Sequence, residues 1–560
     1  LPLTPNGKID RSALPEPDPH RMTAGKVYVA PETDAERVLA DIWGQLLRLD
    51  RVGTQDNFFE LGGDSILSIQ VIARATQAGL HLTPKDLFEH QTIATLAAVA
   101  ATGTAILAEQ GPVTGDVPLT PIQRWFFEQA PPEPDYFNWG TLMQIPSSLE
   151  PDLMRQALEH LLAHHDALRL RLALTPLGWQ QTLVSPGGDV PFVDMDLSAV
   201  GDDALPQAIE AAATGFQTSL SLTKGPLIRV ARLALGSHRP GRLLVLVHHI
   251  AVDAVSWRIV LEDLMGLYKQ LRAGQTPRLP PKTTSFKQWS ELLLDYARSD
   301  LVQAERSYWL DPRRRALGRL PLDHPAGVNT KDSMAFFTHD LAPATLRGLL
   351  QEVVPAYQTQ VQVVLLAALA VAINRWCGSP RLVINFEGHG REDIGAEVNI
   401  ARTVGWFTLY YPLLLDLGEP GDLGDDLKAV RDQFQAVPNR GLGYLLLRYL
   451  GDDQELRQEI ANLPVGEIGF NYMGQREGAQ GGAGASQSGH ATESMGPTQS
   501  RRGLRPHLLD VSGALRGNQL QMRWTFSRNL HNQATIENLA ESFFGVLENL
   551  VSAVRAPDGL

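Results

Sequence analysis

The pattern of apolar and polar positions divides the chain into segments of different character. Residues 1–30 are rich in proline and have no periodic apolar face, which is typical of a linker or tail. Residues 31–103 carry apolar side chains at helical spacing and predict a small all-α bundle of four helices. After the small, polar residues 104–115, which predict an interdomain linker, residues 116–560 alternate strand-like apolar runs with helical periods and predict a large α/β domain.

The helix signals of the small bundle are specific. Thr33 followed by Glu36 forms a capping-box pattern ahead of an apolar face, and a second helix is predicted to begin at Ser65. Shorter helices are predicted over residues 84–90 and 92–101. The apolar face of the first helix consists of Val38, Leu39, Ile42, Trp43, Leu46 and Leu47.

The large domain is predicted to have two lobes, over about residues 116–290 and 291–560. Residues 360–376 are apolar on nearly all sides and therefore predict a buried helix. Ser256 is predicted to cap a further helix. The Gly- and Ser-rich residues 478–500 show no period, so we interpret them as a mobile loop without a catalytic role.

Composition excludes several classes of function. A length of 560 residues with 44% hydrophobic and 20% charged residues predicts a globular chain of three or so domains. The net charge of −13 argues against nucleic acid as a partner, because phosphate binding needs a basic face. No apolar run reaches transmembrane length, so no membrane partner is expected. The single cysteine, Cys377, predicts no internal disulfide, is interpreted as a core residue and suits a reducing cytoplasm.

A predicted strand over residues 243–247 ends in two histidines. His248 and His249 follow the strand, and Asp253 comes four residues after the second histidine. A carboxylate close to an imidazole can fix its tautomer and orientation, so the pattern indicates a general acid or base. Histidines that only cap the sheet or bind adventitious metal are the alternative.

A second predicted strand, over residues 382–386, ends in Glu387. By itself this side chain could equally be a carboxylate in a surface loop. With His249 it forms a pair of titratable groups at strand ends in different lobes, which is what moving a proton across a carbon centre requires. His164, His165 and Asp166 look similar but lie within a helical period, so they are predicted to be structural.

The stretch DNFFELGGDSI, residues 56–66, resembles the phosphopantetheine attachment motif of peptidyl carrier proteins. The resemblance implies that Ser65 carries a covalent 4′-phosphopantetheine arm, with Gly63 and Asp64 as neighbours of the site. On spacing alone, a serine at this position would be interpreted as a helix N-cap. A GGDS sequence is typical of carriers that are paired with an epimerization domain.

The stretch HHIAVDAVSW resembles the condensation-type superfamily, which implies a two-lobed, V-shaped, chloramphenicol acetyltransferase-like fold. In that family the second histidine, here His249, faces the cleft, and the aspartate is structural. Ala254 stands where glycine is common, and its methyl group should be tolerated unless the position needs positive φ. The matching residues are His248, His249, Asp253, Ser256 and Trp257.

The stretch EGHGRE, which begins at Glu387, resembles a signature of epimerization domains that condensation domains lack. Three further stretches resemble blocks of the same family. They imply that Arg402 contacts the phosphopantetheine phosphate or a carboxylate, that Trp406 and Phe407 wall the tunnel, with core packing as an equal alternative, and that Tyr444 lines the cleft. They also imply that Asn471 and Tyr472 lie near the reacting centre, as donors for an enolate oxygen.

These resemblances lead to one preferred hypothesis, a carrier–epimerase didomain of a nonribosomal peptide synthetase, active in antibiotic and other secondary metabolism. Glu387 is the preferred base and His249 the preferred acid, and neither a metal nor a redox cofactor is required. The alternatives are a peptide-bond-forming condensation domain and a non-catalytic docking module.

The hypothesis also implies partners. The beginning of the chain, LPLTPNGKIDR, resembles the end of an adenylation domain, although Lys8 has no substrate to contact without that domain. The expected partners are an upstream adenylation domain, a phosphopantetheinyl transferase and a downstream condensation domain.

Overall fold

The computed structural model describes residues 28–100, 108–315, 317–395, 398–418, 421–475, 489, 491–516 and 519–556. The chain forms two compact units, Leu1–Ala105 and Ile106–Leu560. Residues 1–27, which form most of the predicted tail and include Lys8, lie outside the described residues. Residues 101–107, where the predicted linker begins, also lie outside them.

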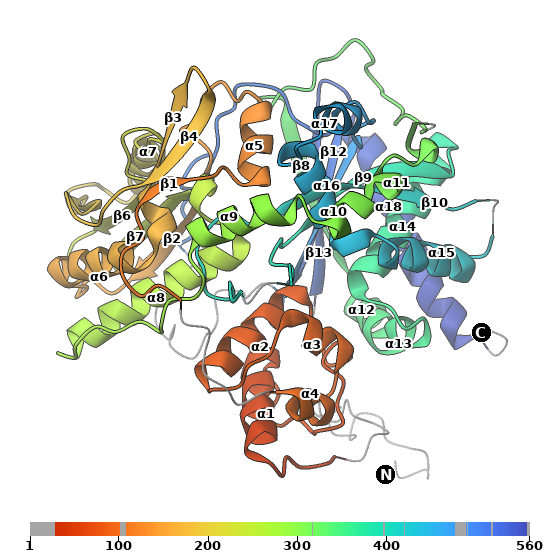
Figure 1. Ribbon diagram of the computed structural model, residues 1–560. Helices are drawn as coiled ribbons and strands as arrows, with labels where there is room; N and C mark the ends of the chain where they lie inside the picture. The colour runs from red at the N-terminus through yellow and green to blue at the C-terminus, as the bar shows by residue number, and fades with distance from the viewer. Residues whose placement is uncertain are drawn as a thin grey trace, which may run out of the picture. The chain divides into compact units, whose positions relative to one another are not determined.

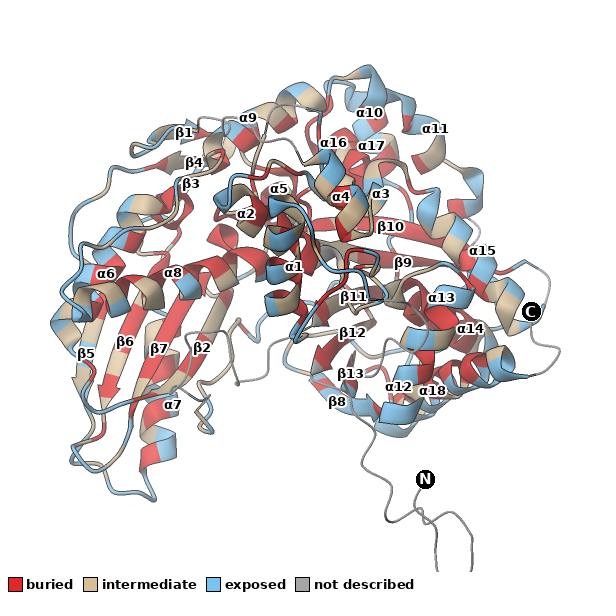
Figure 2. Cartoon of the chain, turned by 90° about the horizontal axis from the view of Figure 1, so that it is seen from below, coloured by how far each residue is buried: buried red, intermediate tan, exposed pale blue. Residues whose placement is uncertain are grey.

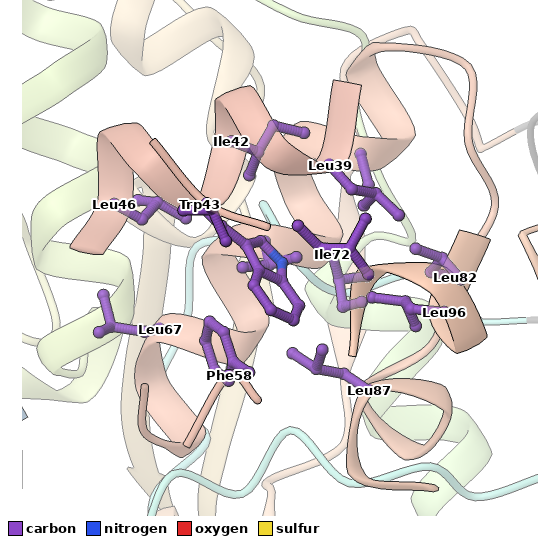
Figure 3. Close-up of a cluster of buried hydrophobic side chains, with 14 of the residues drawn as sticks. Leu39, Ile42, Trp43, Leu46, Phe58, Leu67, Ile72, Leu82, Leu87 and Leu96 are labelled. Carbon is purple, nitrogen blue, oxygen red and sulfur yellow. The ribbon is translucent and has the colours of Figure 1, made fainter. Parts of the chain in front are cut away.

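The described part of the small unit is a bundle of helices (Figure 1). These are α1 (Asp34–Leu47), α2 (Ser65–Gln77), α3 (Pro84–Glu89) and α4 (Ile93–Val99). Thr33 caps α1 and completes the predicted capping box with Glu36. The apolar face of α1 packs into the common core, where the rings of Trp43 and Phe58 lie 4.9 Å apart (Figure 3). The predicted bundle and its first apolar face are therefore confirmed.

The first lobe of the large unit is built on a four-stranded sheet. Its helices and strands are β1 (Gly115–Val117), α5 (Pro121–Glu128), β2 (Asn138–Ile145), α6 (Pro151–His164), β3 (Leu170–Thr175), β4 (Gly178–Leu183), β5 (Phe192–Asp196), α7 (Leu205–Gln217), β6 (Ile228–Ala234), β7 (Gly241–His248) and α8 (Ala254–Arg272). The main sheet has the order β2-β7-β6-β5, and a small sheet has the order β1-β4-β3. On one face of the main sheet, Ile209 and Ala213 of α7 share a buried cluster with Leu244 and Leu246 of β7. Helices α6 and α8 lie together across the other face (Figure 2).

The second lobe is built on a six-stranded sheet that lies beside the first (Figures 1 and 2). The remaining elements are α9 (Phe286–Tyr296), α10 (Asp300–Ala304), α11 (Arg306–Trp309), β8 (Met334–Leu341), α12 (Pro343–Gly348), α13 (Val354–Ala356), α14 (Val361–Cys377), β9 (Arg381–Gly388), β10 (Leu409–Asp416), α15 (Leu423–Gln435), α16 (Leu442–Tyr449), α17 (Gln454–Ala461), β11 (Ile468–Gln475), β12 (Leu509–Arg516), β13 (Gln519–Ser527) and α18 (Gln533–Arg555). The sheet order is β10-β9-β11-β12-β13-β8, and β11 pairs in parallel with both β9 and β12. The predicted two-lobed α/β fold is confirmed. Strand β12 was not predicted, because its sequence LDVSGALR lacks a β-branched run.

Helix α14 is the buried helix that the apolar residues 360–376 predicted. All side chains from residue 363 to 373 are buried, and the helix packs against α15 and α18. Within the described ranges, no single helix is both long and apolar enough to cross a membrane, and only the bent pair of α12–α13 with α14 meets this test on length and composition.

The tract 478–500, predicted to be a mobile loop, is ordered where the structure describes it. Residues 491–500 run along β2, and the N–H of Asn138 donates to the carbonyl of Thr498 at 2.8 Å. The rest of the tract, apart from residue 489, lies outside the described residues. The mobile-loop prediction is wrong for residues 491–500, because pairing with the edge of a sheet in the other lobe satisfies backbone groups whatever their side chains.

Candidate active site

The two histidines at the end of β7 have different surroundings. His248 is fully buried, its Nδ1 accepts the N–H of Ile250 at 3.1 Å, and its Nε2 lies 2.8 Å from the carbonyl oxygen of Pro134. These contacts assign the ring proton to Nε2. Burial lowers the pKa of His248 to about 4. His248 is therefore a neutral side chain that holds the end of the strand.

His249 begins a 3₁₀ turn, His249–Ala251, and its ring lies among aromatic side chains. The ring stacks on Phe137 with 4.7 Å between centroids, while the rings of Trp406 and Trp139 lie at 4.6 and 5.6 Å. Burial in this apolar environment lowers the pKa of His249 to about 4, so the imidazole is neutral at neutral pH. Trp406, one of the two predicted wall residues, thus lies directly against His249.

Glu387 lies near the end of β9 between polar side chains from both neighbouring strands. Tyr410 of β10 is its register partner and donates a hydrogen bond from its hydroxyl to Glu387 Oε2 at 2.9 Å. On the other side, Asn471 of β11 follows Phe470, the last residue of β11 in register with β9. Burial raises the pKa of Glu387 to about 7, and hydrogen bonds from Tyr410 and Asn471 oppose this rise by stabilising the carboxylate.

These pKa values give Glu387 and His249 protonation states opposite to the roles of base and acid that the sequence favoured. Burial disfavours the charged form of both side chains. Between these two pKa values, Glu387 therefore holds a proton and His249 is neutral. In this state the carboxylic acid can donate a proton and the imidazole can accept one, whereas the sequence favoured Glu387 as the base.

Helix α5 contacts the surroundings of both groups. Trp125 stacks on Tyr410, the hydrogen-bond donor to the carboxyl group, with 4.8 Å between ring centroids. The next residue, Phe126, lies 6.0 Å from the ring of Trp406, which contacts the imidazole. Consecutive residues of one helix in the first lobe thus support the acid–base groups contributed by both lobes.

A buried arginine that the sequence analysis did not single out joins the two motifs. Arg391, in the EGHGRE stretch, has a side chain only 1% exposed, and its Nη2 lies 2.8 Å from Ser256 Oγ and 3.5 Å from Asp253 Oδ1. Its guanidinium also lies 3.9 Å from the centroid of the Phe407 ring, so Phe407 packs on this ion pair. The sequence contained a signal for such a cation, because an aspartate that follows a buried strand needs a cation or several hydrogen-bond donors to stay charged.

Asp253, and not Ser256, caps α8. Its Oδ1 accepts the N–H of Ser256 at 2.7 Å, and its Oδ2 accepts the N–H of Phe407 at 3.1 Å. The Ser256 hydroxyl instead donates to the carbonyl of Gly405 at 2.7 Å. The predicted serine cap is wrong, because the carboxylate three residues earlier already satisfies the helix N–H. Ala254 is the first residue of α8 and has no positive φ, so its methyl group is tolerated as predicted.

Arg402 belongs to a buried network away from the acid–base pair. Its Nη2 donates to Asp263 Oδ1 at 2.5 Å, and the other oxygen of Asp263 lies 2.8 Å from His165 Nε2. The carboxylate that Arg402 contacts is therefore one of the protein's own, and the phosphate contact that the resemblance implied has no support from this geometry. The network also confirms that His165 is structural.

The other predicted site residues lie in different surroundings. Trp257 of α8 lies 6.1 Å from Trp139, one of the rings around the imidazole. Tyr444 is buried in the second lobe, where its ring packs 5.2 Å from Trp309, so it is a core residue. Tyr472 follows Asn471 on β11 and pairs with Gly513 of β12, so its side chain points to the sheet face opposite that of Asn471. The two side chains therefore do not meet at one centre, contrary to what the resemblance implied.

In the small unit, Ser65 is the first residue of α2, after a tight turn. A Cβ at Gly63 would lie 2.4 Å from the ring of Phe58, and Gly62 has a φ of +97°, so this turn requires both glycines. The N-cap is Asp64, whose Oδ1 accepts the N–H groups of Ile66 and Leu67 at 2.8 Å. The interpretation of Ser65 as an N-cap is therefore wrong, and the position fits a modified serine whose helix end is already capped.

Two sequence families match the two units. The family described as "Condensation domain" matches residues 113–559, and "Phosphopantetheine attachment site" matches residues 37–100. The chain belongs to the condensation-domain family. With its carrier domain, this condensation-family enzyme domain has the organisation of a nonribosomal peptide synthetase, and the predicted phosphopantetheine attachment domain is confirmed.

Relatives of this condensation-family chain are found among large synthetases. It is 44% identical over 560 residues to one of the linear gramicidin synthase subunits of Brevibacillus parabrevis, covering 99% of this chain and 7% of that protein. It is 45% identical over 549 residues to chondramide synthase cmdD of Chondromyces crocatus, covering 97% of this chain and 14% of that protein. The chain thus spans a small part of the relatives that it matches.

Solved structures similar to this condensation-family domain include two of different activity. The epimerization domain from the third module of tyrocidine synthetase B matches with a TM-score of 0.73 and 32% identity, over 80% of this chain and 99% of that chain. The first condensation domain of the calcium-dependent antibiotic synthetase matches with a TM-score of 0.58 and 18% identity, over 79% of this chain and 97% of that chain. The second likeness supports the fold alone.

Proposed function

We propose that the large domain epimerizes the Cα of an L-aminoacyl or peptidyl thioester that is tethered to the carrier domain of the same chain. The observation that carries the proposal is Glu387, a partly buried carboxyl group near the end of β9 that has a pKa of about 7 and accepts a hydrogen bond from Tyr410. Inverting a carbon centre requires proton removal on one face and proton delivery on the other. The 32% identity to a solved epimerization domain also supports it.

In the proposed reaction, His249 and Glu387 divide the two proton transfers. Neutral His249 accepts the Cα proton of one isomer, and protonated Glu387 delivers its proton to the opposite face. The return reaction uses the Glu387 carboxylate as base and the His249 imidazolium as acid. We assign Asn471, whose side chain lies beside Glu387, as a donor to the developing enolate oxygen, where such a donor contributes about 10²–10³ in rate.

The substrate is proposed to arrive on Ser65 through a 4′-phosphopantetheine arm, which supplies the thiol of the thioester and thereby a more acidic Cα proton. Asp64 caps the helix that begins at Ser65, and Gly63 belongs to the tight turn before it. A phosphopantetheinyl transferase would install the arm, an adenylation domain upstream would supply the amino acid, and a condensation domain downstream would accept the D-isomer.

One assay separates this proposal from a peptide-bond-forming domain and from a non-catalytic docking module. The holo-carrier is loaded with an L-aminoacyl group in deuterated buffer, the reaction is quenched, and the thioester is hydrolysed. We expect both D-isomer and deuterium at Cα. Recovery of the pure L-isomer without deuterium would contradict the proposal, and transfer of the group to a second aminoacyl carrier would favour condensation.

The dependence of kcat/KM on pH tests how the two groups share the work. With two groups, both directions need the state in which the pair holds one proton, so activity falls as His249 is protonated near pH 4 and falls again as Glu387 is deprotonated near pH 7. If Glu387 acted alone as the base, activity would rise with pH through about 7. Initial rates of D-isomer formation, measured from below pH 4 to above pH 7, distinguish the bell-shaped profile of two groups from the rising profile of a single base.

A further inference from the structure

Tyr410 occupies a position between Glu387 and a helix of the other lobe. Its hydroxyl lies 2.9 Å from Glu387 Oε2, and its ring stacks on Trp125 of α5 with an interplanar angle of 29°. A phenol that is held by its ring and bonded through its hydroxyl has little rotational freedom left. The carboxylate that receives the bond is therefore held in one orientation.

The groups around Glu387 come from several elements. Asn471 on β11 donates to its carboxylate, and Asp510 on β12 opposes ionisation electrostatically, whereas His507 favours it. Asp510 is itself bonded to His507 Nδ1 at 2.6 Å and to Arg505 at 2.7 Å, so much of its charge is compensated within that cluster. On the β10 side, the direct hydrogen-bond donor to Glu387 is Tyr410.

We propose that Tyr410 is a positioning residue for the acid–base chemistry of Glu387, acting through the hydrogen bond from its hydroxyl to the carboxylate. This inference rests on the proposed epimerase function. The phenol has to remain protonated to act in this way, and burial beside Glu387 raises the pKa of Tyr410 well above its usual range. Tyr410 therefore serves as a hydrogen-bond donor across the working pH range, and it does not itself take up the Cα proton.

The hydrogen bond has a consequence that packing alone would not have. It stabilises the ionised carboxylate and so lowers the pKa of Glu387, against the effect of burial. Without the hydroxyl, the pKa of Glu387 should rise further. A hydrogen bond to a charged group corresponds to a shift of about one pH unit.

The test is Tyr410→Phe in the full holo-chain, because phenylalanine keeps the ring that stacks on Trp125 and removes only the hydroxyl. We expect the limb of the pH–rate profile near 7 to move upward by about one unit, together with a loss of maximal rate of about tenfold from poorer orientation of the carboxylate. An unchanged limb would overturn the proposal, whatever happens to the rate.

The control variant is Tyr411→Phe. Tyr411 is the next residue on β10, is buried, and points to the opposite face of the sheet, where its ring packs on Trp309 and Phe386. This substitution removes a buried hydroxyl from the same strand. We expect it to leave the limb near pH 7 in place. An equal shift in both variants would show a general effect of the strand and would refute a specific role for Tyr410.

An infrared titration separates failure of this inference from failure of the epimerase proposal. The band of the protonated carboxyl group of Glu387 is assigned by its absence in Glu387→Gln, and its midpoint is measured in the wild type and in Tyr410→Phe. A higher midpoint in the variant is expected even if no D-isomer is formed by either protein. Equal midpoints would refute the role of Tyr410 whether or not the wild type epimerizes.

Discussion

Glu387→Gln is expected to slow inversion of the carrier-bound aminoacyl group by a factor of about 10²–10⁴. The amide has almost the same shape as the carboxyl group and can still accept the hydrogen bond from Tyr410, so the fold should be unaffected. What is lost is a group with a pKa of about 7 that can gain and release a proton. The measurement is the ratio of D- to L-isomer against time after loading.

Deuterium exchange makes this prediction more specific. If His249 works on the face opposite Glu387, it can still remove and return the Cα proton of one isomer. Exchange without inversion should therefore persist in Glu387→Gln for either the L- or the D-aminoacyl substrate, but not for both. His249→Ala should retain exchange for the other isomer. Exchange lost completely in one variant and unchanged in the other would indicate a single base.

Glu392→Gln is the matched control for Glu387→Gln. Glu392 lies in the same EGHGRE stretch, and its side chain is 11% exposed and 3.5 Å from His389 Nε2. Glu392→Gln also replaces a carboxylate by an amide, but it does so five residues away from Glu387 at a side chain that does not contact Tyr410. We expect inversion within a few-fold of the wild type. Similar losses in both variants would mean that disturbance of this segment, rather than removal of the acid–base group, explains the effect.

Arg391→Met is expected to have the largest effect on stability. It removes the cation beside Asp253 and leaves a carboxylate whose side chain is 6% exposed without an ionic partner. Breaking a buried ion pair in this way costs about 3–5 kcal/mol in the free energy of unfolding. Methionine retains much of the contact with the ring of Phe407, so lost charge dominates the effect. Urea unfolding of the full chain, followed by tryptophan fluorescence, measures the loss.

Two further variants test this explanation. Arg391→Met combined with Asp253→Asn removes both charges, and it should recover part of the lost stability because no buried charge is left unpaired. Arg298→Met breaks an exposed ion pair with Asp452, and little change is expected because solvent already screens that pair. If Arg391→Met were as stable as Arg298→Met, the ion pair between the two motifs would be dispensable.

Local sequence signals predicted the helices and strands whose formation depends on side chains within the same segment. The capping box of Thr33 and Glu36 and the apolar residues 360–376 correspond to α1 and α14, because periodicity and capping act within one helix. The strand that carries Glu387 was predicted for a similar reason, since a run of apolar residues is buried wherever it lies. Ser256 was wrongly predicted to cap α8 because Asp253, the residue that does cap it, had been interpreted as a carboxylate that orients the imidazole.

Contacts between strands could not be predicted in the same way. The bond between Tyr410 and Glu387 depends on the register of β10 against β9, and a shift of one residue would turn the phenol to the opposite face. The pairing of residues 491–500 with β2 depends on which sheet edge lies within reach. Neither register nor a free edge is encoded in the composition of the segment concerned.

The sequence by itself therefore determined the order of a carrier domain and a condensation-family domain, and it identified His249 and Glu387 as the titratable ends of two buried strands. Only the tertiary structure decided their protonation, because the pKa of a side chain depends on what surrounds it. An aromatic enclosure lowers the pKa of His249 to about 4, and burial raises that of Glu387 to about 7 despite its hydrogen bonds. Residues distant in sequence, such as Trp406 and Tyr410, supply these surroundings through the packing of the two lobes.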